Sequence, residues 1–477
     1  MKNGMPPSAP PSSTGAPDVP PAPDPAVPPA PTAAPGSRLG WLDALRGLAA
    51  LVVVMQHFGV LRMLPHGEFI RRNFDMGLFG VMLFFIVSGY IIPASLERRG
   101  DVRGFWIGRI FRIHPALIVT LAVSIMMLPD GDGSVRLLRT GDDLTSLIAN
   151  GLLLPDFLGI PNGMNVTWTL CYEMVFYFFV TALFTRGLHR HSAPLAVGCA
   201  ALALTVGTAV GEHLLTPDPG SVRPLLLIVT PVALAGFAGV LSGRPGPTRA
   251  GAVLLGGLGL VLVTLNSRAP WFETWTIFAT MFAGTAVYRA QHARRGSTPS
   301  LGAIGFVVVA GTLVGWLYNR GGFENHTWTT GWQSWSFAYL AAWIVFGIGF
   351  LLRGRRFPRV LTWLGAISFS LYLLHFPLLR TIGHLVGVPP LPSSTLGKFV
   401  WTGLFFTVAL AASHLMYRLV ELPMQNLGRR VQRAAARRRP TAPAAPAAPA
   451  APAGPVPAPR AAREEPARAG ATARDGG

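Results

Sequence analysis

Three ionisable side chains lie inside long apolar stretches of this sequence, where such groups are costly and usually functional. They are His57, Glu173 and His375. An imidazole titrates near neutral pH and can act as a base, and a buried carboxylate needs a partner. The three residues therefore indicate a base-and-carboxylate pair. The alternative for each is a structural role, as a polar group bonded to a neighbouring helix.

Arginines form a second group of chemical interest. Arg46 precedes His57 by eleven residues, close to three helical turns, so the two side chains share a helix face about 16 Å apart. Arg109 and Arg112 are three residues apart and also share a face. Because the planar guanidinium binds phosphate well, the three arginines predict a polyanion site. The alternatives are snorkelling of Arg46 and simple charge anchoring at the membrane surface.

The composition shows what must position these residues. Of 477 residues, 51% are hydrophobic and only 13% are charged, against roughly 25% charged in a soluble domain. Apolar runs of about 20 residues recur, and each can cross a bilayer as a helix. The sequence predicts an all-α, polytopic transmembrane helix bundle of about 10–12 spans. The candidate spans are 41–60, 74–96, 107–128, 168–185, 194–215, 222–241, 251–266, 271–290, 300–319, 334–352, 361–386 and 397–420.

The charges predict the orientation of the bundle. The net charge is +19, and every second loop is rich in arginine, as the positive-inside rule requires. We therefore expect a multi-pass protein of the cell inner (plasma) membrane with both termini in the cytoplasm, and no nucleic-acid partner. Helix rise then places His57, Glu173 and His375 at similar depths in the outer half of the bilayer. The arginine-rich loops carry Arg98, Arg99, Arg103, Arg186, Arg190, Arg244, Arg249, Arg294, Arg295, Arg353, Arg355, Arg356 and Arg359.

Two low-complexity tails flank the apolar part. Residues 1–37 consist largely of Pro, Ala and Ser, and residues 429–477 are basic at first and then rich in Ala, Pro and Arg. Such segments cannot bury a core, so we expect both cytoplasmic tails to be disordered, with the transmembrane domain at 38–428. No signal peptide is expected, because prolines replace an apolar segment near Met1. Cys171 and Cys199 suit neither a disulfide framework nor a metal motif.

The motifs occur in an order that resembles the acyltransferase-3 family. Arg46 and His57 form Arg-x10-His, and the later motifs resemble those of the family over residues 39–425. The resemblance is to the kind of member without an additional soluble domain. The later motifs are Phe-Phe-x-x-Ser-Gly-Tyr (84–90), Arg-Ile-x-Arg-Ile-x-Pro (109–115), Trp-Thr-Leu-x-x-Glu-x-x-Phe-Tyr (168–177), Ile-Ser-x-Ser-Leu-Tyr-x-x-His (367–375) and Tyr-x-x-x-Glu-x-Pro (417–423).

The resemblance implies an O-acyltransferase that moves an acyl group, acetyl or longer, from acyl-CoA to a hydroxyl. Acyl-CoA is then a co-substrate, with no bound cofactor or metal, and the acceptor is a carbohydrate, a glycolipid or a secreted natural product such as a macrolide. Arg46, Arg109 and Arg112 would bind the CoA phosphates. His57 would act as general base, oriented by Glu173, or as an acyl carrier. The candidates for acceptor or oxyanion contacts are Ser88, Tyr90, Trp168, Tyr372 and His375.

Two other classes of protein fit parts of the pattern. Helix packing alone would explain the glycines and serine around Ser88 and the pairing of Tyr372 with His375. A proton-coupled multi-pass transporter would also place His and Glu inside the bilayer, but no internal repeat is visible. A sensor or scaffold without turnover is the third class.

Overall fold

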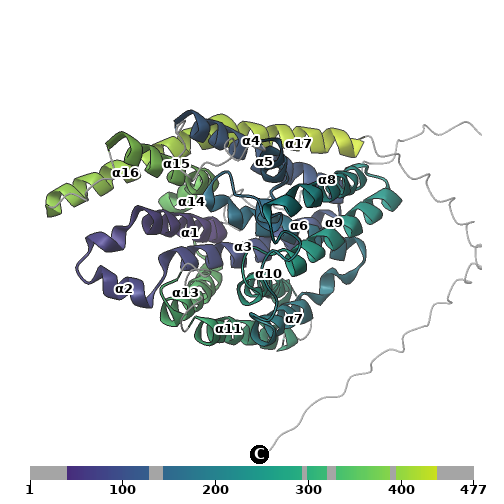
Figure 1. Cartoon of the computed structure of the whole chain (residues 1–477), viewed down its shortest axis with the longest axis horizontal. Coiled ribbons are helices and arrows are strands. Elements are labelled where there is room, and N and C mark those ends of the chain that lie inside the picture. Colours follow the sequence, from purple (N-terminus) through teal and green to yellow (C-terminus); the bar gives the residue numbers. More distant parts are fainter. Residues whose placement is uncertain (1–39, 128–142, 293–297, 320–328, 387–393, 438–477) are drawn as a thin grey trace, which may run out of the picture.

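The computed structural model describes residues 40–127, 143–292, 298–319, 329–386 and 394–437 (Figure 1). Within these ranges every regular element is a helix. The expected disorder of residues 1–37 and of the tail beyond residue 437 lies outside the described residues. The main helices are α1 (Gly40–Phe58), α2 (Gly67–Asn73), α3 (Met76–Arg99), α4 (Val102–Met127), α5 (Asp143–Leu152), α6 (Trp168–Thr185), α7 (Ser192–Thr205), α8 (Pro219–Leu241), α9 (Pro245–Leu265), α10 (Trp271–His292), α11 (Thr298–Tyr318), α13 (Trp332–Leu351), α14 (Arg359–Ala366), α15 (Ser368–Val386), α16 (Thr395–Met416) and α17 (Leu422–Arg437).

Nine helices of the described part are long and apolar enough to cross a membrane, and the bent pair α14–α15 makes up to ten. The predicted all-α transmembrane bundle is thus confirmed at the lower end of its range. The predicted span at 194–215 is wrong, because α7 has only 14 residues. A helix of that length covers about 21 Å, less than the ~30 Å of hydrocarbon.

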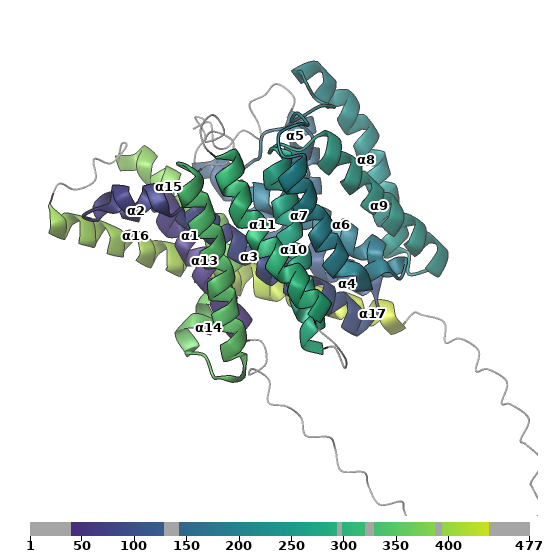
Figure 2. The same cartoon turned by 90° about the horizontal axis from the view of Figure 1, so that it is seen from below.

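The helices form a bundle with its two faces at the top and bottom of Figure 2. In that view α10, α11 and α13 run side by side from top to bottom, α14 lies at the lower face and α5 at the upper face. Helix α3 lies at the centre and packs against α1, α10 and α13. Exposed Leu and Ile side chains of the outer helices, such as Leu227 and Ile228 of α8, face outward, as they must in contact with lipid.

Glycines allow the central helices to approach closely. A Cβ atom added at Gly89 of α3 would lie 2.0 Å from the carbonyl oxygen of Met281, and one at Gly284 of α10 would lie 2.4 Å from that of Ile86. Small residues commonly permit such contacts between membrane helices. The glycine of the Phe-Phe-x-x-Ser-Gly-Tyr motif therefore serves packing between α3 and α10, the structural alternative considered for this motif.

Replacing Gly284 with valine is expected to destabilise the protein by about 1–3 kcal/mol or more, because the added carbons meet backbone atoms that cannot move aside. Gly257→Val is the matched control, since nothing lies within 4 Å of a Cβ added at that exposed position of α9. The measurement is the fraction of detergent-solubilised protein that stays monodisperse after heating. Equal heat resistance of the two variants would contradict the packing argument.

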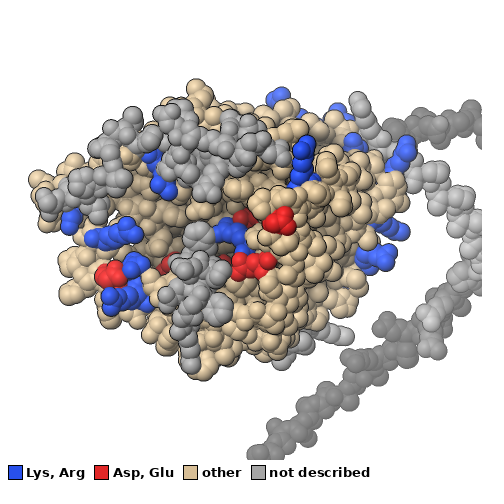
Figure 3. Space-filling view, in the orientation of Figure 1, with Lys and Arg blue, Asp and Glu red and all other residues tan. Residues whose placement is uncertain are grey.

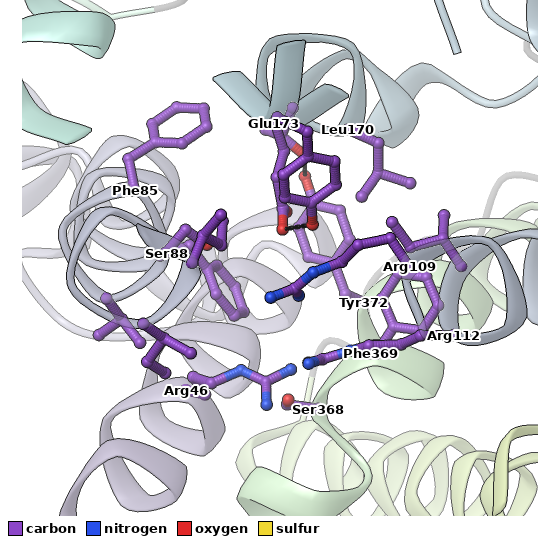
Figure 4. Close-up of a pocket in the computed structure, with 17 residues that line it drawn as sticks. Arg46, Phe85, Ser88, Arg109, Arg112, Leu170, Glu173, Ser368, Phe369 and Tyr372 are labelled. Atoms are coloured by element: carbon purple, nitrogen blue, oxygen red, sulfur yellow. Dashed lines mark hydrogen bonds between the residues drawn. The ribbon is translucent and has the colours of Figure 1, made fainter. Parts of the chain in front are cut away.

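Two irregular segments place residues of the site. The predicted single span 361–386 is broken, since α14 and α15 meet at an angle of 65°. Ser368 and Phe369, just after the break, point into the interior (Figure 4). A π-helix at Tyr417–Glu421 joins α16 to α17, and its buried Glu421 accepts a hydrogen bond from Ser370. Short π-helical turns frequently mark functional sites. The predicted domain boundary at residue 428 falls inside α17, which continues to Arg437.

Candidate active site

A pocket of about 80 Å³ lies where α1, α3, α4, α6 and α15 converge (Figure 4). Arg46, Arg109 and Arg112 line it, and Figure 4 shows their guanidinium groups pointing into the same space, with Ser368 beside two of them. We call it the arginine pocket. The other lining residues are Phe84, Phe85, Val87, Ser88, Ile91, Ile92, Ile113, Thr169, Leu170, Glu173, Tyr177, Ser368, Phe369 and Tyr372.

The three arginines have no ion-pair partner within 4 Å among the described residues. Arg109 lies over the rings of Phe105 and Tyr177, at 5.3 and 5.1 Å from their centroids, and donates to Ser95 at 3.3 Å. Ring contacts of this kind hold a guanidinium in place without neutralising it. The pocket therefore offers preoriented positive charge, which suits a phosphate-bearing ligand.

A second cavity, of about 310 Å³, lies beside the far end of α1. His57 stands in the last turn of α1 and lines it, so we call it the histidine cavity. Figure 3 shows basic and acidic side chains gathered around a hollow in the middle of the face that carries α5. The other lining residues are Val53, Gln56, Arg62, Asp75, Gly77, Leu78, Val81, Asn165, Val166, Trp168, Glu273 and Tyr372.

His57 is held by His375 of α15. The Nδ1 atom of His57 lies 2.8 Å from Nε2 of the fully buried His375, and Nδ1 of His375 lies 3.1 Å from the carbonyl oxygen of Leu371. A carbonyl only accepts, so Nδ1 of His375 carries a proton and the Nε2 atom of the neutral ring is an acceptor. His57 must then donate from Nδ1. Its Nε2 atom keeps a free lone pair, as a general base requires.

The expected contact between Glu173 and His57 is not formed in the structure. Glu173 lines the arginine pocket and accepts a hydrogen bond from Tyr177, four residues on along α6. The expectation rested on depth alone, but the face of α6 that carries Glu173 turns toward α4 and Arg109. His375 occupies the orienting position instead, and the catalytic roles of His57 and Glu173 remain predictions.

Tyr372 separates the two pockets and lines both of them. Its hydroxyl donates to the carbonyl oxygen of Val166 at 2.9 Å and lies 2.9 Å from the hydroxyl of Thr169. These bonds tie α15 to the start of α6. Tyr372 therefore stands at the wall that the two pockets share.

The remaining predicted site residues divide into two groups. Ser88 lines the arginine pocket and Trp168 lines the histidine cavity, so the structure brings both to the site. Tyr90 lines neither pocket, and its role as an acceptor or oxyanion contact stays a prediction without support from this geometry. Its hydroxyl bonds to Gln291 and its ring packs against Trp41, since it faces the other side of α3.

Two acidic residues of the site are not among those predicted from the sequence. Asp75 and Glu273 line the histidine cavity and are buried. Burial raises the pKa of Asp75, although its carboxylate caps α3 by accepting from the backbone of Leu78 at 2.7 Å. The argument that singled out Glu173 would also have found Glu273, an acid within a predicted span. In the part of the chain that the structure describes, no group of three or more His, Cys, Asp or Glu side chains could hold a metal ion.

Comparison with known families gives the class of the protein. A family model described as an acyltransferase domain matches residues 39–418. The protein is therefore an acyltransferase, and its helices make it a membrane enzyme. It belongs to the acyltransferase-3 family, as the six motifs indicated.

The chain is also similar to curated relatives over part of its length. "Putative peptidoglycan O-acetyltransferase YrhL" of Bacillus subtilis is 27% identical over 165 residues, which are 31% of this chain and 24% of the relative. "Peptidoglycan O-acetyltransferase OatA" of Listeria monocytogenes is 27% identical over 157 residues, 28% of this chain and 22% of the relative. The chain thus spans about a quarter of the length of these relatives. No solved structure matches the chain.

Proposed function

We propose that this protein transfers an acyl group from acyl-CoA to a hydroxyl of a carbohydrate or a secreted natural product. The observation that carries the proposal is the placement of two groups on either side of Tyr372. One is a set of three arginines that have no ion-pair partner in the described part of the chain, and the other is a histidine whose Nε2 atom keeps its lone pair. The first group suits a polyanionic donor and the second suits an acceptor that must lose a proton.

The donor would bind in the arginine pocket. Arg46, Arg109 and Arg112 would hold the phosphate groups of CoA, and the thioester arm would extend toward Tyr372. Relatives named peptidoglycan O-acetyltransferases favour acetyl as the acyl group and a glycan as the acceptor.

The acceptor would bind in the histidine cavity. Its hydroxyl oxygen attacks the thioester carbonyl while Nε2 of His57 takes the hydroxyl proton. The carbon–sulfur bond then breaks, and the imidazolium returns the proton to the departing CoA thiolate. A covalent acyl-histidine would divide the same reaction into two steps.

The two pockets would face different compartments. With the arginine-rich loops in the cytoplasm, the arginine pocket opens toward the cytoplasmic surface of the plasma membrane and both termini are cytoplasmic. The histidine cavity then lies toward the outer surface, where surface glycans and secreted metabolites are found.

The proposal is tested with the full chain in lipid vesicles, supplied with labelled acetyl-CoA and a panel of glycans. We expect label to appear on the glycan by an ester bond that mild base removes. Proton-coupled uptake of a solute without any acetyl transfer would instead identify a transporter and overturn the proposal.

Arg46→Ala is expected to raise the KM for acyl-CoA by about 10-fold to 100-fold, the effect of losing one charge-assisted hydrogen bond, with a smaller effect on kcat. Arg186→Ala is the matched control, because Arg186 is exposed at the end of α6 and lines neither pocket. Steady-state kinetics over a range of donor concentrations give both constants. An unchanged donor KM in Arg46→Ala would contradict the assignment of the arginine pocket.

A further inference from the structure

Glu273 stands in the first turn of α10 and reaches the wall of the histidine cavity. The residue is 3% exposed. Its Oε2 atom is buried without a hydrogen-bond partner, and no described residue donates to its other carboxylate oxygen. Leaving a buried carboxylate unbonded is costly, so such groups normally have donors. Glu273 therefore has an unmet capacity to accept hydrogen bonds at the cavity where His57 acts.

Arg268, the positively charged neighbour of Glu273, already forms an ion pair with Asp156. Arg268 donates to Asp156 at 3.1 Å and lies over the ring of Trp168, 5.6 Å from its centroid. Asp75, the other acid of the cavity, uses one oxygen to cap α3. Glu273 thus differs from Asp75 and Asp156, each of which accepts a hydrogen bond from a described residue.

The rest of the cavity wall has a recognisable chemistry. Gln56, Asn165, Asp75 and Glu273 supply amide and carboxyl groups, Arg62 supplies a guanidinium that offsets acidic charge, and Trp168 supplies an aromatic face. Carboxylates accept hydrogen bonds from hydroxyls, and an indole ring packs on an apolar surface while tolerating polar neighbours. A volume of about 310 Å³ is at the lower end of the range of small-molecule sites. These features fit a compact ring that carries several hydroxyls.

We propose that Glu273 binds the acceptor, accepting hydrogen bonds from hydroxyl groups of a neutral sugar ring beside the hydroxyl that His57 deprotonates. This inference rests on the proposed function, because it assigns the acceptor side of that site. It narrows the acceptor class to an uncharged sugar unit and makes Glu273 a determinant of specificity.

The test measures binding of methyl N-acetyl-β-glucosaminide to the purified full chain without acyl-CoA, by isothermal titration calorimetry. Methyl β-glucosaminide, which has the same ring with a cationic amine, is the matched probe. We expect the neutral sugar to bind, and Glu273→Gln to weaken it by up to about 10-fold, since the substitution replaces one oxygen that accepts hydrogen bonds with an amide that only donates. Glu68→Gln, on the exposed surface of α2, is the control and should bind like the unaltered protein.

Each other outcome has a definite meaning. Equal binding of the neutral sugar by the Glu273→Gln variant overturns the assignment of Glu273. Binding of the cationic sugar alone overturns it also, because the carboxylate would then be a counter-ion for an amine, and so does failure of both sugars to bind. Binding that depends on Glu273, without acetyl transfer to the sugar when acetyl-CoA is added, supports this inference while removing the proposed transfer reaction.

Discussion

His57→Ala is expected to lower kcat for acyl transfer by about 10²–10⁴-fold, the usual contribution of a general base. The variant loses the only ring nitrogen of the described histidine pair that keeps a free lone pair at the cavity. The KM for acyl-CoA should change little, because Arg46, the phosphate-binding residue on the same helix, lies about 16 Å along α1 from His57. Transfer of labelled acetyl to a glycan in vesicles gives both constants.

His292→Ala is the control for this experiment, since His292 is exposed at the end of α10 and bonds only to its own helix among the described residues. Both variants should insert into the membrane in equal amounts. Full activity of His57→Ala would remove His57 from the mechanism. An acetyl group trapped on His57 of the unaltered protein would select the two-step route.

His375→Leu is expected to lower kcat by about 10²-fold. Leucine has a similar size but cannot accept the proton of Nδ1 of His57, so the ring loses the partner that fixes its tautomer and orientation. When a carboxylate has this role in a catalytic triad, its loss of charge costs about 10⁴-fold. A neutral imidazole stabilises the cation less, and the expected effect is correspondingly smaller.

His375→Gln is the matched variant, because its side-chain oxygen can still accept from His57. It should recover a large part of the activity that His375→Leu loses, and the donor KM should stay the same in both. A purely structural role would lead to a different result: glutamine, a polar residue in a fully buried position, would then be more harmful than leucine.

The sequence predicts the helical class and most helix positions because apolar length is a strong signal. The sequence overestimates the number of spans at α7. The residues after Thr205 are apolar enough to predict a longer helix, but they form turns. The break between α14 and α15 was missed for a related reason. A mean hydropathy taken over residues 361–386 does not reveal the 65° bend between the two helices. Near the bend, Gly365 lies so close to the backbone of Asp43 in α1 that a Cβ atom would not fit.

The depth of the candidate site residues was predictable from the sequence, whereas their pairings were not. Span direction and helical rise placed His57 and His375 at a common depth, and the structure brings them together. Depth does not define rotation about the helix axis. Glu173 therefore contacts Tyr177 instead of His57, and Tyr90 faces away from both pockets. The rotation of each helix is set by its contacts with neighbouring helices, such as that between Tyr177 and Arg109.

The hydrogen bonds of Tyr372 to Val166 and Thr169 have a consequence for the cell that contains this enzyme. A bundle with water-accessible openings toward both surfaces would short-circuit the membrane potential if the openings joined. If the two pockets open to opposite surfaces as proposed, Tyr372, Val166 and Thr169 lie where such a leak would have to be blocked. A variant with a smaller side chain at this position is therefore a place to look for ion conductance.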